Sequence, residues 1–348
     1  MPTQLNHYRL LGHSGLRVSP LCLGTMTFGE EWGWGASEGE SRKLLEAYAE
    51  KGGNFLDTAD MYTNGTSEKL LGKFLQGRRD QFVLATKYSF SSRQGDPNAG
   101  GNHRKHMQEA LNASLKRLNT DYIDLYWVHV YDGLTPIEEM MRALDDAVRA
   151  GKILYIGVSD FPAWRISQAN TLAELKGWTP FVALQIEYSL VERTVERDLI
   201  PMARAMGLGV TPWSPLAGGV LTGKYNKPSA EDKRYKGDDP FAKKYVTERN
   251  LAIAKEVMNV ASQVGRSAAQ VALAWLVSKP GVTSTIIGAR KASHLQDNLD
   301  ALSLDLPREA MKKLDQASAV DMGFFNEFVA NPQVSSFLSG GTVTKRET

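Results

Sequence analysis

The chain is poor in cysteine, in charge of one sign and in long apolar runs. Cys22 is the single cysteine among 348 residues, so the chain cannot form a disulfide with itself, which fits a reducing cytoplasm. The 41 Lys and Arg residues against 39 Asp and Glu leave a formal net charge of +2, which gives no sign of nucleic-acid binding. No apolar run reaches the roughly 18 residues of a membrane helix, and the polar first ten residues do not resemble a signal peptide. These absences predict a soluble cytoplasmic protein that binds neither nucleic acid nor a membrane.

Eight short apolar runs alternate with segments of helical periodicity, which predicts a parallel sheet covered by helices. The number eight, and the lack of a Gly-x-Gly-x-x-Gly sequence after an early run, favour a closed (β/α)8 TIM barrel over a doubly wound sheet. The predicted strands are residues 21–24, 54–57, 82–86, 123–128, 153–158, 181–185, 209–211 and 285–287. The clearest predicted helices are residues 40–50, 67–76, 104–117, 137–149, 163–175 and 195–206.

The segments outside this alternation complete the predicted architecture. Within residues 1–20, two apolar runs flank His13-Ser14-Gly15, which predicts an N-terminal β-hairpin. No break in composition marks a second domain, so residues 1–348 are predicted to form a single barrel domain. Residues 320–348 are predicted to be a C-terminal tail that frays at its polar end. Three irregular stretches, residues 28–37, 89–103 and 215–245, are predicted to be long active-site loops.

Polar residues stand where the predicted strands end, and in a barrel these ends face the active site. Asp57, Lys87 and His129 end three strands, and Tyr62 lies five residues after Asp57. A carbonyl that accepts a hydride also needs a proton, which a tyrosine can donate. A buried lysine would lower the tyrosine pKa from its usual value of about 10. A carboxylate such as Asp57 would keep that lysine charged, and a neutral imidazole could orient the carbonyl oxygen.

Each of these residues also has an ordinary structural interpretation. Asp57 alone could cap a helix, Tyr62 could be a packed aromatic, Lys87 could reach solvent along an apolar stem, and His129 could be a satisfied core histidine. The functional interpretation gains weight because the four residues converge at one end of the predicted barrel.

Sequence blocks in the same order resemble those of the aldo-keto reductase family, over residues 7 to 318. They are residues 57–62 (DTADMY), 67–72 (SEKLLG), 85–87 (ATK), 121–132, 157–159 (GVS), 213–216 (WSPL), 221–225 (LTGKY) and 287–290 (IGAR). The resemblance implies a catalytic tetrad of Asp57, Tyr62, Lys87 and His129. It also implies NADP(H)-dependent, reversible hydride transfer that reduces an aldehyde or ketone to an alcohol, with Tyr62 as the general acid.

The resemblance further implies that NADPH or NADP+ binds extended across the barrel top. Residues implied for the nicotinamide are Ser159, Asp160 and Gln185 at its carboxamide and Trp213 on its ring. Residues implied for the rest of the cofactor are Thr25, Ser214, Leu216, Gly218, Lys224, Arg234 or Lys233, Gly288, Arg290, His294, Asp297 and Asn298. Among these, Arg290, with Arg234 or Lys233, would meet the adenosine 2′-phosphate, because the planar guanidinium fork of arginine suits phosphate. This favours NADP(H) over NAD(H).

Two residues depart from the family pattern. Asp160 stands where Asn is usual, and an ionised carboxylate accepts hydrogen bonds but cannot donate one. Thr63 stands where Gly is usual, which restricts the turn after Tyr62. Trp32 and Trp34 either pack their loop onto the barrel or, with Tyr88, line a pocket for a small carbonyl substrate with an apolar body. A homo-oligomer is left open.

Two other functions remain open from the sequence. One is a metal-dependent barrel hydrolase or isomerase that uses Asp57, His129 and Asp160, although no His-x-His follows the first strand and no metal site is predicted. The other is a non-catalytic subunit that senses the redox state by binding NADP(H). Metal analysis would identify the first, and turnover of NADPH with aldehydes would separate the enzyme from the second.

Overall fold

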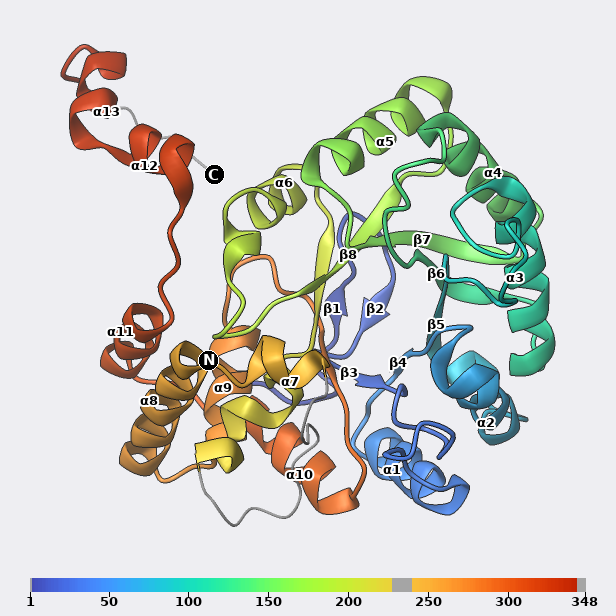
Figure 1. Cartoon of the computed structure of the whole chain (residues 1–348), viewed down its shortest axis with the longest axis horizontal. Coiled ribbons are helices and arrows are strands. Elements are labelled where there is room, and N and C mark those ends of the chain that lie inside the picture. Colours follow the sequence, from blue (N-terminus) through green and yellow to red (C-terminus); the bar gives the residue numbers. More distant parts are fainter. Residues whose placement is uncertain (1, 227–239, 343–348) are drawn as a thin grey trace.

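A computed structural model describes residues 2–226 and 240–342 of the chain. Its centre is an eight-stranded, all-parallel sheet in the order β10-β3-β4-β5-β6-β7-β8-β9, and an isolated bridge from Val210 to Val282 brings its two edges together. Figure 1 shows the helices around this sheet. The predicted TIM barrel is therefore confirmed. Within the described residues, no helix is long and apolar enough to span a bilayer.

The strands and helices lie close to their predicted positions. The barrel strands are β3 (Leu21–Gly24), β4 (Phe55–Asp57), β5 (Val83–Tyr88), β6 (Ile123–Val128), β7 (Ile153–Ser159), β8 (Phe181–Glu187), β9 (Gly209–Trp213) and β10 (Thr285–Ile287). The helices are α1 (Glu38–Glu50), α2 (Thr66–Phe74), α3 (Arg104–Leu118), α4 (Ile137–Arg149), α5 (Ala163–Lys176), α6 (Leu199–Ala205), α7 (Pro240–Tyr245), α8 (Glu248–Val264), α9 (Ala268–Val277), α10 (Ala292–Asp300), α11 (Arg308–Ala317), α12 (Gly323–Ala330) and α13 (Pro332–Ser339). Short 3-10 helices cover Tyr62–Gly65, Arg79–Gln81, Thr194–Glu196, Ala217–Thr222, Lys224–Asn226 and Ala301–Ser303.

Alternation along the strands divides the core into two apolar layers. On β5, Val83 and Ala85 belong to the layer inside the barrel, whereas Leu84 and Tyr88 belong to the layer between sheet and helices. Successive side chains of a strand point to opposite faces, so Lys87 shares the inner face with Val83 and Ala85. This parity places the side chain of Lys87 in the barrel lumen.

The predicted N-terminal hairpin is confirmed as an antiparallel pair, β1 (Arg9–Leu10) and β2 (Arg17–Val18). Leu11, which follows β1, and Val18 of β2 are fully buried in the inner layer. The backbone of Gly12 lies against that of Gly209 at the start of β9. The hairpin thus closes the barrel at the amino ends of its strands, which leaves the carboxyl ends for the site.

Three regions differ from the sequence-based expectations. Residues 215–245 were expected to be irregular, yet their described part contains two 3-10 helices and α7. Residues 195–206 form a 3-10 turn followed by the shorter helix α6 rather than one helix. No helix was predicted in the tail after Val320, but the tail forms α12 and α13; its polar end, residues 343–348, where fraying was expected, lies outside the described residues.

Candidate active site

Asp57, Lys87 and Tyr62 meet at the carboxyl ends of β4 and β5. Asp57 pairs in register with Ala85, so Lys87 is the next inward-facing residue beyond that pair. The ammonium of Lys87 donates to a carboxylate oxygen of Asp57, to the carbonyl oxygen of Thr58 at 2.7 Å and to the hydroxyl of Tyr62 at 3.1 Å. Lys87 has no exposed side-chain surface and Asp57 has 3%. The predicted buried ion pair beside a phenol is therefore present.

Burial and charge act in opposite directions on these groups. Burial lowers the pKa of the Lys87 ammonium, but the nearby Asp57 carboxylate and Tyr62 outweigh it, so this pKa lies above its ordinary value. Burial raises the pKa of the Tyr62 hydroxyl, and the lowering effect of Lys87 does not cancel it. The expectation that Lys87 would bring the tyrosine pKa below its usual value is therefore wrong for this state, because the phenol is too deeply desolvated. Tyr62 keeps its proton at neutral pH.

The turn that carries Tyr62 has an unusual backbone. Thr63 and Asn64 have φ angles of 46° and 54°, in the left-handed region that L-residues enter at a cost of about 1–2 kcal/mol. The hydroxyl of Thr63 donates to the carbonyl oxygen of Phe28 at 2.7 Å and accepts from the backbone N–H of Ser67 at 3.1 Å. These two bonds hold the turn in the conformation that glycine would adopt freely.

Three aromatic side chains lie near Tyr62: His129 and Trp32 contact its ring, and Phe90 contacts the ring of His129. Between ring centroids, His129 is 6.0 Å from Tyr62, Phe90 is 4.8 Å from His129, and Trp32 is 6.3 Å from Tyr62. Burial and the Lys87 charge hold the pKa of His129 well below its ordinary value, so the imidazole is neutral. Phe90 was not among the predicted pocket residues, although it stands in the irregular stretch that follows β5.

The residues predicted for the nicotinamide lie on β7, β8 and β9, next to this cluster. The amide nitrogen of Gln185 donates to Asp57 at 3.0 Å, across the lumen from β4. The indole N–H of Trp213 and the hydroxyl of Ser159 donate to Asp160 at 3.3 and 3.4 Å. Asp160 has an exposed surface at the barrel mouth, but protein surrounds its carboxylate, and this burial raises its pKa to about 6.

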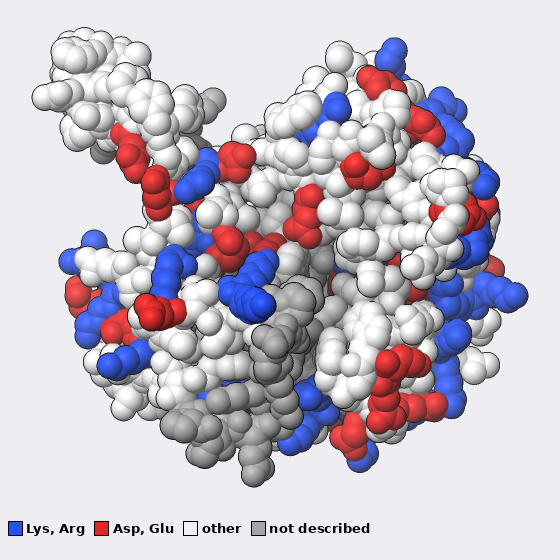
Figure 2. All heavy atoms as spheres, viewed as in Figure 1, with Lys and Arg blue, Asp and Glu red and all other residues white. Residues whose placement is uncertain are grey.

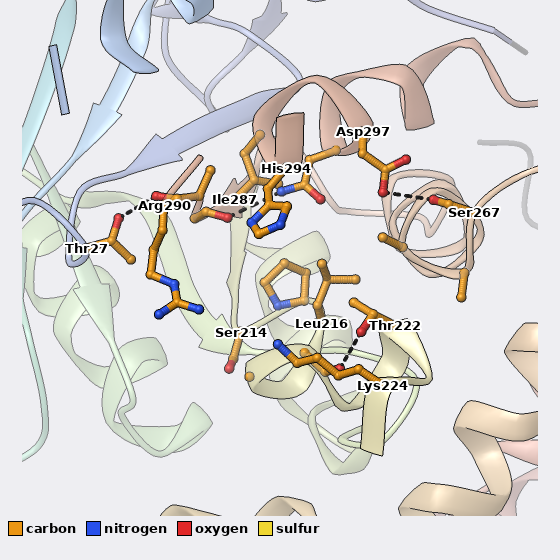
Figure 3. Close-up of a pocket in the computed structure, with 18 of the residues that line it drawn as sticks. Thr27, Ser214, Leu216, Thr222, Lys224, Ser267, Ile287, Arg290, His294 and Asp297 are labelled. Carbon is orange, nitrogen blue, oxygen red and sulfur yellow. Dashed lines mark hydrogen bonds between the residues drawn. The ribbon is translucent and has the colours of Figure 1, made fainter. Parts of the chain in front are cut away.

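A cavity of about 390 Å³ continues from this end of the barrel. One wall is the loop from Ser214 to Lys224 after β9, and the other is formed by the end of β10 and the start of α10, as Figure 3 shows. Nine predicted cofactor residues line it, namely Ser214, Leu216, Gly218, Lys224, Gly288, Arg290, His294, Asp297 and Asn298. The loop wall is tightly folded, with φ of 54° at Ser214 and 49° at Ala217. Such strained backbone concentrates at ligand sites.

The cavity wall carries cationic side chains and a carboxylate that is hydrogen-bonded to neighbouring side chains. Lys224 and Arg290 reach it from opposite walls, and α10 begins there, so its N-terminal dipole adds positive potential. The carboxylate of Asp297 accepts from Ser267 at 3.0 Å and from Gln270 at 2.8 Å, which ties α10 to α9. The two cationic side chains and the helix N-terminus together outweigh this one carboxylate, which favours an anionic ligand.

Some predicted residues lie elsewhere. Tyr88 was predicted to line the substrate pocket, but it is fully buried and stacks on Tyr126 at 5.2 Å, because it faces outward when Lys87 faces inward. Thr25 is fully buried, and its hydroxyl donates to the carbonyl oxygen of Asp57 at 3.0 Å. Trp34 lines the cavity just described and also packs against Trp32, with the ring centroids 5.6 Å apart. Lys233 and Arg234 lie outside the described residues.

The structure adds cavity residues that the sequence did not reveal. Thr27 lines the wall near β10, where its hydroxyl donates to the carbonyl oxygen of Ala289 at 2.9 Å. Ser267 caps α9 and binds Asp297, a residue 30 positions further on. The capping pattern of Ser267 is visible in the sequence, but its contact with the cavity depends on the packing of α9 against α10. Among the described residues, no group of three or more His, Cys, Asp or Glu side chains is arranged to hold a metal ion.

The sequence model of the aldo/keto reductase family matches residues 20–319. The chain therefore belongs to this family of oxidoreductases, as its sequence blocks predicted. Among its relatives, norsolorinic acid reductase of Aspergillus flavus is 38% identical, over 98% of this chain and 88% of its own length. Aryl-alcohol dehydrogenase, NADP(+), of Phanerodontia chrysosporium is 38% identical, over 93% of this chain and 89% of its own length. Aldo-keto reductase ausK of Aspergillus calidoustus is 37% identical, over 93% and 85%.

Proposed function

We propose that the protein is an NADP(H)-dependent carbonyl reductase in which Tyr62 donates the proton. The observation that carries the proposal is the contact of 3.1 Å between the Lys87 ammonium and the Tyr62 hydroxyl, with Lys87 paired to the buried Asp57 carboxylate. A buried cation beside a phenol serves a reaction in which the phenol loses a proton, because it stabilises the phenolate that remains.

The cavity beside β9 and β10 has the chemistry that NADP(H) requires. Lys224, the N-terminus of α10 and the tight loop after Ser214 would hold the pyrophosphate. Arg290 would bind the adenosine 2′-phosphate with its planar fork. The relative whose name includes NADP(+) supports this choice over NAD(H). The nicotinamide would lie beside Tyr62, held by Ser159, Asp160, Gln185 and Trp213. Thr25 would help to position Asp57 through its hydrogen bond to the Asp57 backbone.

When bound, NADPH supplies the hydride that the carbonyl carbon accepts. Tyr62 transfers its hydroxyl proton to the carbonyl oxygen, so that an aldehyde or ketone becomes an alcohol. Lys87 stabilises the phenolate formed on Tyr62, and Asp57 keeps Lys87 charged inside the barrel. His129 is neutral and can donate a hydrogen bond to the carbonyl oxygen, which orients it toward Tyr62. In the reverse direction the same phenolate accepts the proton of the alcohol.

Aromatic side chains favour a substrate with an aromatic body. Trp32 and Phe90 flank the pair of Tyr62 and His129, and aromatic rings bind flat rings through offset or edge contacts. Two relatives are named for norsolorinic acid and for aryl alcohols, which points to the same class. We therefore propose aryl aldehydes or ketones as substrates.

Replacement of Tyr62 by Phe tests the proposed acid. We expect turnover of NADPH with a benzaldehyde to fall by about 10²- to 10⁴-fold. The affinity for NADPH, followed by quenching of tryptophan fluorescence, should stay within about threefold, since the cavity residues are unchanged. Tyr8→Phe is the matched control, because it removes a hydroxyl at the far end of the barrel. Normal turnover of Tyr62→Phe would refute the assignment, and negligible turnover of the unaltered protein with tight NADPH binding would favour the sensor.

A further inference from the structure

The last two helices form an arm that stands away from the barrel. The C-terminal arm, as we call residues 323–339, comprises α12 and α13 and follows a short connection after α11 (Figure 1). Its root is fixed, because the guanidinium of Arg197 donates to the carbonyl oxygen of Asp321 at 2.8 Å and Asn326 donates to the carbonyl oxygen of Arg197 at 3.3 Å. The arm is therefore held in a defined direction at its base.

The helices of the arm are amphipathic, yet their apolar faces are exposed. Phe324, Phe325, Phe328 and Val329 follow the spacing i, i+1, i+4 and i+5, which gathers them on one broad face of α12. Their exposed fractions are 79%, 70%, 51% and 49%. On α13, Phe337 and Leu338 are exposed at 83% and 80%. Helices with such a face are ordinarily stabilised by packing it against something apolar.

The exposed apolar area of the arm is large for a monomer. A phenylalanine can bury about 150–250 Å², so these six side chains expose roughly 700 Å². Apolar patches on monomeric proteins usually measure about 300–600 Å². Glu327 is the one charged residue between positions 323 and 340, and Figure 2 shows the arm almost without charge beside a barrel surface that carries both signs.

We propose that the arm pairs with the same arm of a second copy of this chain, so that α12 and α13 of both copies form a small four-helix bundle. A symmetric dimer places one patch against itself, which requires no separate acceptor surface. Two arms that cover each other would bury roughly 1,400 Å² in total, within the 1,200–2,000 Å² of stable interfaces. An anionic membrane is disfavoured as the occupant, because residues 323–340 contain no Lys or Arg to meet its surface.

The oligomeric state of the full chain tests this pairing. Multi-angle light scattering should give a dimer at micromolar concentration. The double variant Phe325→Glu/Phe337→Glu should be a monomer, with the dimer weakened by at least about 100-fold, because two desolvated anchors become charged. Leu175→Glu is the matched control, since Leu175 on α5 is similarly exposed, at 78%, but lies outside the arm. Both variants should keep the circular dichroism and NADPH turnover of the unaltered chain, because the arm contributes no residue to the site.

Cross-linking tests whether the two arms meet each other. Cys22, the single native cysteine, is buried, so an introduced cysteine reacts alone. A short bis-maleimide should join two copies of Val329→Cys or Leu338→Cys, and it should not join Leu175→Cys. Each of three results would overturn the proposal: a monomeric full chain, including one that binds phosphatidylserine vesicles; a dimer that Phe325→Glu/Phe337→Glu leaves intact; or a dimer whose arm cysteines do not cross-link.

Discussion

The cluster around Lys87 and the cavity around Arg290 are built in different ways. Lys87 and Asp57 stand on neighbouring strands inside the barrel, where their charges are shielded from water and held by direct contacts. Arg290 follows β10, and Lys224 begins a short 3-10 helix in the segment after β9; both side chains line the cavity at the rim. In the proposed function, the first region would hold the groups that react, and the second would present positive charge to an anionic ligand.

The difference in burial changes what each region contributes to stability. A buried ion pair is costly to break, because the partner that remains is an uncompensated charge. A charge at the rim is screened by solvent, so its loss affects binding much more than folding. The two regions should therefore respond differently to the removal of one cation.

Replacement of Lys87 by Met should have the largest effect. The variant leaves Asp57 buried without its cation, so the free energy of unfolding should fall by about 3–5 kcal/mol. Turnover should fall by at least about 100-fold, because Tyr62 loses the cation that stabilises its phenolate. Urea unfolding followed by circular dichroism, with NADPH absorbance for turnover, measures both effects.

The double variant Asp57→Asn/Lys87→Met is the control for this interpretation. Removing both charges should recover most of the lost stability without recovering turnover. If Lys87→Met unfolded at the same urea concentration as the unaltered protein, the contrast between the two regions would be lost.

Replacement of Arg290 by Ala should show the opposite pattern. We expect the dissociation constant for NADPH to rise by about 10- to 100-fold, and that for NADH by less than about threefold, because the 2′-phosphate would lose a charged hydrogen bond. The free energy of unfolding should change by less than about 0.5 kcal/mol. Arg142→Ala, on the outer surface of α4, should alter neither constant. Equal losses for the two cofactors would exclude a 2′-phosphate contact.

Asp160 lies between the two regions and should give the smallest effect. Its carboxylate accepts from Trp213 and Ser159 and lies near Glu187 and Lys244, and burial raises its pKa to about 6. Below this pH the group is a neutral acid that can donate a hydrogen bond to the nicotinamide carboxamide; above it, the ionised group can only accept. The affinity for NADPH should therefore weaken by about threefold to tenfold as the pH rises from about 5 to about 7.

Asp160→Asn isolates this contribution from the titration of the cofactor phosphate. The asparagine keeps a donor at every pH, so the variant should bind NADPH more tightly than the unaltered protein at pH 7 and equally at pH 5. If the NADPH affinities of the two proteins changed with pH in the same way across this range, Asp160 would not contact the cofactor.

The strand-built region was largely predictable from the sequence. A lysine that ends a buried apolar run needs a carboxylate partner. Because the strand before Lys87 in the chain is its neighbour in the sheet, Asp57 at the end of that strand was the predicted partner. The same alternation that turns Lys87 inward turns Tyr88 outward, so the direction of Tyr88 follows from its position on the strand. The pKa direction of Tyr62 could not be predicted, because it depends on how deeply the packed loops bury the phenol.

The loop-built and terminal regions were less predictable, since their contacts join residues far apart in the chain. His106 is buried and His103 caps α3, which no pattern in the sequence indicated. The contact between Ser267 and Asp297 depends on how α9 and α10 pack together, and the local sequence of neither helix reveals it. The apolar face of α12 is visible in the spacing of its phenylalanines, but its exposure depends on the direction in which the tail leaves the barrel.

The amide of Gln185 spans the lumen and donates its N–H to Asp57 from β8. An amide can normally rotate to exchange its nitrogen and oxygen ends, but the anionic neighbour selects one orientation, with the oxygen turned away from Asp57. A group that docks beside Gln185 on that side thus meets a hydrogen-bond acceptor whose direction is already chosen. Asp57, which balances the charge of Lys87, thus also determines that the position beside Gln185 offers a hydrogen-bond acceptor.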